Sequence, residues 1–164
     1  MSKSYYSHRL GKVSEERFKR AATSLGFSVS KSSRNEDIYD HIDFWLEVDG
    51  KVWAADVKGN NLPEEIWCEF KNVNGDAGWI YGKSHIIAFE MPEAGGFIIV
   101  DRRELLAYMR DNVSDEKVSN KRDAYKKKYT RKDRQDVITT LCVSDLKTLT
   151  SYRVWAYCKQ GFID

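Results

Sequence analysis

The sequence predicts an α/β (α+β) protein: a single layered domain in which a central mixed β-sheet is flanked by helices. Apolar residues recur with helical spacing near the N-terminus, and short apolar runs typical of strands dominate the middle of the chain. With 164 residues and 41% hydrophobic content, the chain can bury one core but is short for two ordinary domains. We therefore expect one domain over 1–164, with its core at about 9–110 and a basic segment at 117–134.

The N-terminal third of the chain contains a helix pattern and a hairpin pattern. Apolar residues follow helical spacing over 12–25, and Gly26 can end the helix in a left-handed conformation. Two apolar runs, 42–48 and 51–58, then flank Asp49-Gly50, a dipeptide typical of tight turns. These runs predict a β-hairpin.

The remainder of the chain contains patterns for further strands and two helices. Asp101 can cap a helix over 102–110, whose apolar residues again follow helical spacing. Ser144 can cap a shorter helical turn in the same way. Further strands are expected at 27–29, 66–70, 84–91, 97–100, 137–143 and 152–158.

Charge is segregated along the chain, although the net charge is only +2. Residues 35–116 contain eighteen acids against seven Lys and Arg, whereas residues 117–134 contain nine Lys and Arg against two acids. Residues 1–34 are also basic, with eight Lys and Arg against two acids. Basic ends suit a polyanion and a central cluster of acids suits bound cations, although ordinary surface charge is the alternative.

No apolar run approaches the roughly 18 residues of a membrane-spanning helix, and residues 1–12 lack the apolar stretch of a signal peptide. The sequence therefore predicts a cytoplasmic protein without a membrane partner. The three cysteines form no Cys-x-x-Cys pair and lie in apolar stretches, which indicates buried, reduced thiols rather than a zinc site.

Acid-x-Lys tripeptides occur five times, and one alone is weak evidence because a chain of this length contains roughly one by chance. Two of them, Asp56-Val57-Lys58 and Glu69-Phe70-Lys71, lie in expected strands. The apolar residues before Asp56 are typical of a central strand, and Asp43 lies on the partner strand of the same hairpin, whereas Glu69 has no such partner. The other three tripeptides begin at Asp49, Asp115 and Asp145.

The side chains of Asp56 and Lys58 leave the same face of their strand, because they are two residues apart. Asp43 lies at a similar distance from the hairpin turn, so the two carboxylates can converge. Such a pair is costly unless a cation or a proton relieves the repulsion, which is typical of a hard-metal site. A lysine there can offset the charge that develops when a phosphodiester is attacked. The alternative is a surface ion pair between Asp56 and Lys58.

The chain contains Arg9-Leu10-Gly11 with Glu15, then 25–29, then Asp43 and, after twelve residues, Asp56-Val57-Lys58. In the order and spacing of these residues, the first sixty residues resemble the PD-(D/E)xK nucleases, most closely the archaeal Holliday-junction resolvases and related phage nucleases. The segment 66–83 has no resolvase counterpart that can be aligned, which leaves the substrate geometry open.

The resemblance implies a restriction-endonuclease-like core and a magnesium-dependent endodeoxyribonuclease that hydrolyses phosphodiester bonds, with Mn²⁺ as an alternative metal. It implies DNA as the partner, including branched or structured DNA in phage replication or recombination. A nuclease-fold module that binds DNA or protein without catalysis is the alternative from another functional class. The sequence leaves open whether the protein is a homodimer.

The resemblance also implies roles for individual residues. Asp43, Asp56 and the carbonyl of Val57 would be metal ligands, and Lys58 would be the catalytic cation. Glu15 would position a metal or water, with Glu16 the alternative at that place.

Other polar residues are candidates for neighbouring roles. Glu69 can orient Lys58 or a metal-bound water, and His41 can reach the same face as Asp43. Trp79 and Tyr81, between glycines, can stack on an exposed base, although packing around a turn is the simpler interpretation.

The run of cations at 117–134 is the strongest sign of a phosphate-binding surface, with Tyr125 and Tyr129 interleaved at helical spacing. A solvated helix or a mobile loop is the alternative. In the family a basic residue at the position of Arg9 contacts phosphate. The DNA-binding candidates are Arg9, Lys126, Lys127, Lys128, Arg131 and Lys132.

Overall fold

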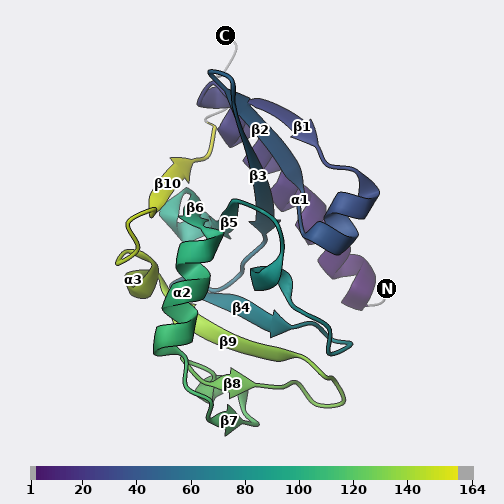
Figure 1. Ribbon diagram of the computed structural model, residues 1–164, viewed down its shortest axis with the longest axis vertical. Coiled ribbons are helices and arrows are strands. Elements are labelled where there is room, and N and C mark those ends of the chain that lie inside the picture. The colour runs from purple at the N-terminus through teal and green to yellow at the C-terminus, as the bar shows by residue number, and fades with distance from the viewer. Residues whose placement is uncertain (1–2, 159–164) are drawn as a thin grey trace.

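The computed structural model of the protein describes residues 3–158, and side chains from residue 10 onward. The chain is α+β, as the sequence predicts, but its strands form two sheets rather than one (Figure 1). A six-stranded sheet has the order β1-β2-β3-β5-β6-β10, and a four-stranded sheet has the order β4-β9-β8-β7. Among the described residues, no helix has the length and apolar character needed to cross a membrane.

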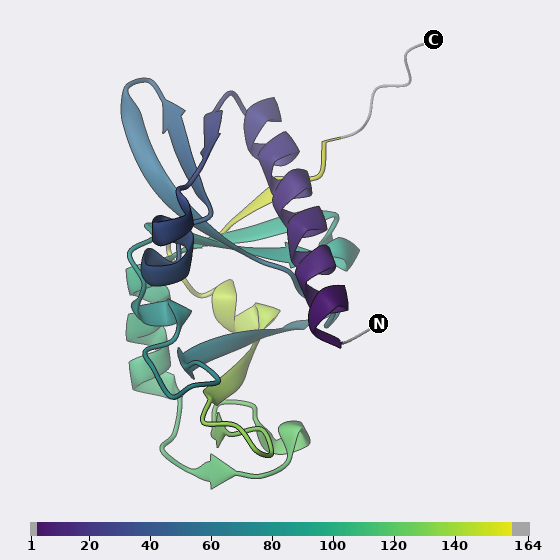
Figure 2. The same cartoon turned by 90° about the vertical axis from the view of Figure 1, so that its right-hand side faces the viewer.

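Helix α1 (Lys3–Ser24) runs along one side of the six-stranded sheet (Figure 2). It begins earlier than expected and ends before Gly26, whose φ of 94° is the expected left-handed conformation. Phe18, Ala21 and Ala22 are fully buried against strand residues of this sheet, and these contacts form one of two core clusters.

The predicted hairpin is confirmed as β2 (Phe44–Val48) and β3 (Lys51–Lys58), paired from Phe44↔Ala55 to Val48↔Lys51. Its two turn residues, Asp49 and Gly50, have φ of 50° and 73°, which matches the right-handed twist of the strands. The turn therefore fixes the register, and the register decides which residues face each other at the far end of the hairpin.

The other strands of the six-stranded sheet surround this hairpin. β5 (Ile86–Met91) runs parallel to β3, which makes the sheet mixed, and β6 (Gly96–Asp101) runs antiparallel to β5. β1 (Ser28–Lys31) and β10 (Arg153–Ala156) form its two edges. Helix α2 (Arg102–Asn112) begins as expected, because the Asp101 side chain accepts a hydrogen bond of 2.9 Å from the Glu104 amide.

The four-stranded sheet contains β4 (Glu65–Lys71), β9 (Val137–Cys142), β8 (Lys128–Tyr129) and β7 (Lys117–Val118). A second core cluster lies between this sheet, the six-stranded sheet and α2, and includes Ile66, Phe89 and Leu105. The following short helix α3 (Val143–Leu146) is capped at Cys142 rather than at Ser144.

The basic segment does not form the helix that its tyrosine spacing allowed. It consists of β7, the 3₁₀ turn η4 (Lys121–Asp123), β8 and connecting loops. Lys126 and Asp133 have φ of 54° and 60°, a left-handed conformation that interrupts a right-handed helix. The segment therefore extends the four-stranded sheet, and its strands β8 and β7 lie below β9 in Figure 1.

Candidate active site

Asp43 and Asp56 face each other at the open end of the hairpin, one step beyond the pair Phe44↔Ala55. The Asp43 amide donates to the Ala55 carbonyl at 2.9 Å, and its Oδ2 accepts from the Val57 amide at 2.7 Å. Both aspartates are buried, with 8% of Asp43 and 2% of Asp56 exposed. The backbone of β3 therefore holds the Asp43 carboxylate beside Asp56.

The two oxygens of Asp56 have different surroundings. Oδ1 lies 2.8 Å from Nζ of Lys58, whereas buried Oδ2 has no hydrogen-bond partner within the described part of the chain. Burial raises the pKa of Asp56 to about 7, and the Asp43 carboxylate contributes to the rise while Lys58 opposes it. A buried carboxylate oxygen without a partner is unfavourable, so a cation or a proton at this position would stabilise it.

Lys58 lies at the junction between the two sheets. Burial disfavours its charged form, but Asp56, Asp43 and Glu69 outweigh that effect and raise the pKa of Lys58. Its Nζ also lies 5.1 Å from the centre of the Trp79 ring. Lys58 is therefore a charged ammonium that faces acids of both sheets.

Glu15 reaches the site through a residue that the sequence interpretation did not single out. Nζ of Lys31, on β1, lies 3.1 Å from Glu15 Oε2 and 3.9 Å from Asp43 Oδ1. Glu16 is exposed and lines a different hollow of the surface, with Lys19 among its neighbours. Glu15, rather than Glu16, is thus the helix acid that points toward the hairpin acids.

Two further candidates lie near Lys58. Oε2 of Glu69 accepts from the Trp79 amide at 3.3 Å, and burial raises the pKa of Glu69 while the nearby charge of Lys58 lowers it. His41 ends the π-helix η1 (Glu36–Asp40), and burial together with Lys58 lowers its pKa. Tyr81, by contrast, is exposed.

The described side chains alone do not provide enough ligands to hold a metal ion at this site. Over residues 10–158, no three His, Cys, Asp or Glu side chains are grouped so that they could hold a metal ion. Lys31 and Lys58 lie among the acids instead. Asp43 and Asp56 supply oxygen atoms, the type that Mg²⁺ and Mn²⁺ prefer, and the unpartnered Asp56 oxygen fits such an ion.

The basic residues proposed for DNA binding are largely paired with acids of the same chain. Lys127 lies 3.1 Å from Glu116 and Lys128 lies 2.6 Å from Asp115. Arg131 pairs through Nε with Asp136, which is fully buried. Lys132 is exposed, and it has no ion pair with a described residue. Arg9 lies in α1, but its side chain is outside the part that the structure describes.

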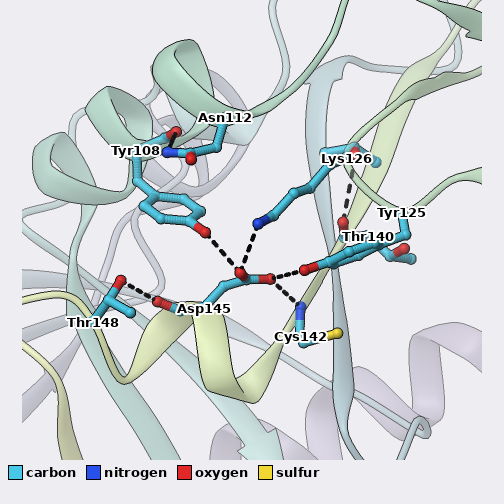
Figure 3. Close-up of polar contacts among 9 residues, drawn as sticks. Tyr108, Asn112, Tyr125, Lys126, Thr140, Cys142, Asp145 and Thr148 are labelled. Atoms are coloured by element: carbon cyan, nitrogen blue, oxygen red, sulfur yellow. Dashed lines mark hydrogen bonds and ion pairs between the residues drawn. The ribbon is translucent and has the colours of Figure 1, made fainter.

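Lys126 belongs to a partly exposed polar cluster around the buried residue Asp145 (Figure 3). The Asp145 carboxylate accepts from the hydroxyls of Tyr108 at 2.7 Å and Tyr125 at 2.9 Å and from the Cys142 amide at 2.8 Å, and it pairs with Lys126 at 2.9 Å. This carboxylate raises the pKa of Lys126. The cluster joins α2, the basic segment and the start of α3, so the ion pair of Lys126 holds these elements together.

Cysteine burial differs along the chain. Cys68 is buried, as expected, and burial raises the pKa of its thiol. Cys142 is half-buried and Cys158 is exposed, so the expectation of three buried thiols is correct for Cys68 alone.

No protein-family model matches the sequence, and no curated protein does. One solved structure that is similar to this chain is that of a bacterial homing endonuclease, I-Ssp6803I, with a TM-score of 0.49 and 14% sequence identity. The match covers 62% of this chain and 72% of that chain. At this similarity it assigns no role to any residue of this protein.

Proposed function

We propose that this chain is a divalent-metal-dependent DNA endonuclease of the PD-(D/E)xK type. The observation that supports it most strongly is the Asp56 carboxylate, which is buried opposite Asp43. One of its oxygens has no hydrogen-bond partner among the described residues, and the other lies beside Lys58. A buried carboxylate oxygen without a hydrogen-bond partner is costly, and a bound cation would offset that cost. The arrangement is the one expected when a cation completes the site.

Asp43, Asp56 and the Val57 carbonyl would hold the ion in this proposal. A bound Mg²⁺ or Mn²⁺ would polarise the phosphate and lower the pKa of a bound water. Lys58 would offset the negative charge that develops on the attacked phosphodiester, because its ammonium is charged and held by Asp56. Glu15, through Lys31, would position Asp43 and the water.

The position of Lys31 has a consequence for metal binding. Its ammonium lies between Glu15 and Asp43, where it partly neutralises the acids without an ion. A divalent ion beside Asp43 would compete with it. We therefore expect Lys31→Ala to bind Mn²⁺ at least as tightly as the wild type.

Cleavage of end-labelled DNA tests the function directly. Purified protein is incubated with single-stranded, duplex, nicked, flap and four-way DNA in Mg²⁺, in Mn²⁺ and in EDTA. We expect cleavage in either metal, none in EDTA, and a loss of about 100-fold or more in Asp56→Asn and Lys58→Ala.

The hairpin provides matched controls for both substitutions. Asp49 and Lys51 form the same acid-x-Lys pattern at the exposed turn of the same hairpin. Asp49→Asn and Lys51→Ala should therefore cut at the wild-type rate. Cleavage in EDTA, or full activity of Lys58→Ala, would contradict the assignment. Metal-independent DNA binding without cleavage of any substrate would favour the non-catalytic module.

A further inference from the structure

A cleft of about 640 Å³ lies on the four-stranded sheet, next to the candidate active site. Its floor includes Trp67 and Glu69 on β4, which alternate with the core residues Ile66 and Cys68 and so lie on the opposite face of that strand. The cleft is separate from the polar cluster around Asp145.

Two aromatic side chains form a platform in this cleft. The rings of Trp67 and Tyr129 are in contact, with centroids 6.1 Å apart and planes inclined by 39°. Both side chains are partly exposed, although each has an apolar ring that could have been buried. Half-open aromatic faces on a sheet are typical of proteins on which unpaired bases stack.

The cleft also contains two cations of the basic segment that form no ion pair with a described residue. Lys121 and Arg122, in η4, are exposed, and neither forms an ion pair with a described residue. Asn120 holds this turn, because its side chain accepts from the Arg122 amide at 3.0 Å. Lys127 and Lys128 differ from them, because each forms an ion pair with an acid of the same chain.

Trp79 connects the cleft with the candidate active site. It lines the cleft, its ring lies 5.1 Å from Nζ of Lys58, and its amide donates to Glu69, another residue of the cleft wall. A strand with one phosphate at Lys58 could thus continue past Trp79 toward Trp67.

We propose that this cleft binds an unpaired nucleotide of the DNA strand that enters the active site. The base stacks on Trp67 and Tyr129, and neighbouring phosphates contact Lys121 and Arg122. A paired duplex has the faces of its bases covered by their neighbours, so it cannot use the platform. The inference rests on the proposed nuclease function and narrows its substrate to DNA with a single-stranded segment.

Binding without cleavage tests the platform. Anisotropy of fluorescein-labelled (dT)₁₂ and of a length-matched duplex is measured with the whole chain in EDTA. Stacking on an aromatic side chain contributes enough for Trp67→Ala to weaken (dT)₁₂ binding about tenfold, whereas duplex binding changes less than twofold. Trp67→Phe, which keeps an aromatic face, restores most of the affinity. Trp53→Ala, at a partly buried tryptophan of the other sheet, is the matched control and leaves the affinity unchanged.

A double substitution tests the cations without removing any packed side chain. Lys121→Ala with Arg122→Ala should flatten the slope of log affinity against log salt by up to about 1.4 for (dT)₁₂, because each single-strand phosphate contact contributes about 0.7. Lys19→Ala with Arg20→Ala, an adjacent exposed Lys-Arg pair on α1, is the matched control.

The two proposals fail in different ways. If Trp67→Ala binds (dT)₁₂ like the wild type, or if the wild type does not bind it at all, the cleft proposal is overturned even when metal-dependent cleavage is present. If no DNA is cut but single-strand binding depends on Trp67, the nuclease proposal is overturned and the cleft proposal is supported.

Discussion

Replacement of Asp56 by asparagine isolates the energetic effect of the buried carboxylate. The pKa of Asp56 is about 7 in the folded protein and 3.8 for the ordinary side chain, so the folded state binds more protons between these values. The free energy of unfolding therefore falls as pH rises through this window. Applied to pH 5 and pH 8, the two pKa values give a loss of about 2 to 3 kcal/mol from this group.

Asparagine cannot ionise, so Asp56→Asn should lack this loss. Urea unfolding at about pH 5, 6, 7 and 8 in EDTA, followed by tryptophan fluorescence, gives the free energy at each pH. The measured quantity is the difference in pH dependence between the wild type and Asp56→Asn, which removes the contributions of all other groups. Lys58 does not interfere, because its raised pKa lies above this window.

Asp49→Asn, in the exposed turn of the same hairpin, is the control and should keep the wild-type pH dependence. Equal losses for the wild type and Asp56→Asn between pH 5 and pH 8 would refute the reasoning. That result would mean that Asp56 is ionised throughout this range in the folded protein. The argument for a cation at its unpartnered oxygen would then lose its basis.

Three further outcomes are expected. Mn²⁺ at a hundred times its dissociation constant should add up to about 2.7 kcal/mol to the free energy of unfolding of the wild type at pH 8. Calorimetry should therefore show a higher melting temperature with Mn²⁺ for the wild type but not for Asp56→Asn. Asp145→Asn should lower the free energy of unfolding, measured by urea denaturation, by about 2 kcal/mol, because Asp145 accepts from two tyrosines and pairs with Lys126. Asp111→Asn, at an exposed position, is the control and should leave the stability unchanged. Equal stabilities of the two variants would contradict a stabilising role of the Asp145 contacts. Gly78→Ala should destabilise the protein, because a Cβ there would lie 2.4 Å from the Glu69 carbonyl oxygen. Gly11→Ala, in open space on α1, is the control and should stabilise the protein by about 0.5–1 kcal/mol. A wild-type melting temperature for Gly78→Ala would contradict the close approach of Gly78 to Glu69.

Local chemistry explains which elements could be predicted from the sequence. The hairpin follows from Asp49-Gly50 between two apolar runs, and the α2 cap follows from Asp101, because both depend on residues a few positions apart. The same alternation assigns Asp56 and Lys58 to one face and brings Asp43 opposite. Their association was thus available from the sequence, although their roles remain proposals.

Packing between distant segments decided how the strands divide into two sheets and which conformation the basic segment adopts. Strand β4 pairs with β9, about seventy residues later, so no local pattern could separate the two sheets. The helical spacing of Tyr125 and Tyr129 was misleading, because pairing of β8 with β9 and the Asp145 cluster determine the conformation there.

The sequence by itself determined the α+β class, the hairpin and the shared face of its acids and lysine, because turn chemistry and strand alternation are local properties. Only the tertiary structure decided that Lys31 links Glu15 to Asp43. It also decided that Lys127 and Lys128 pair with acids, while Lys121 and Arg122 form no ion pair within the described part of the chain. Ion pairs and clefts depend on which side chains approach through folding, and a count of charges along the chain does not contain that information.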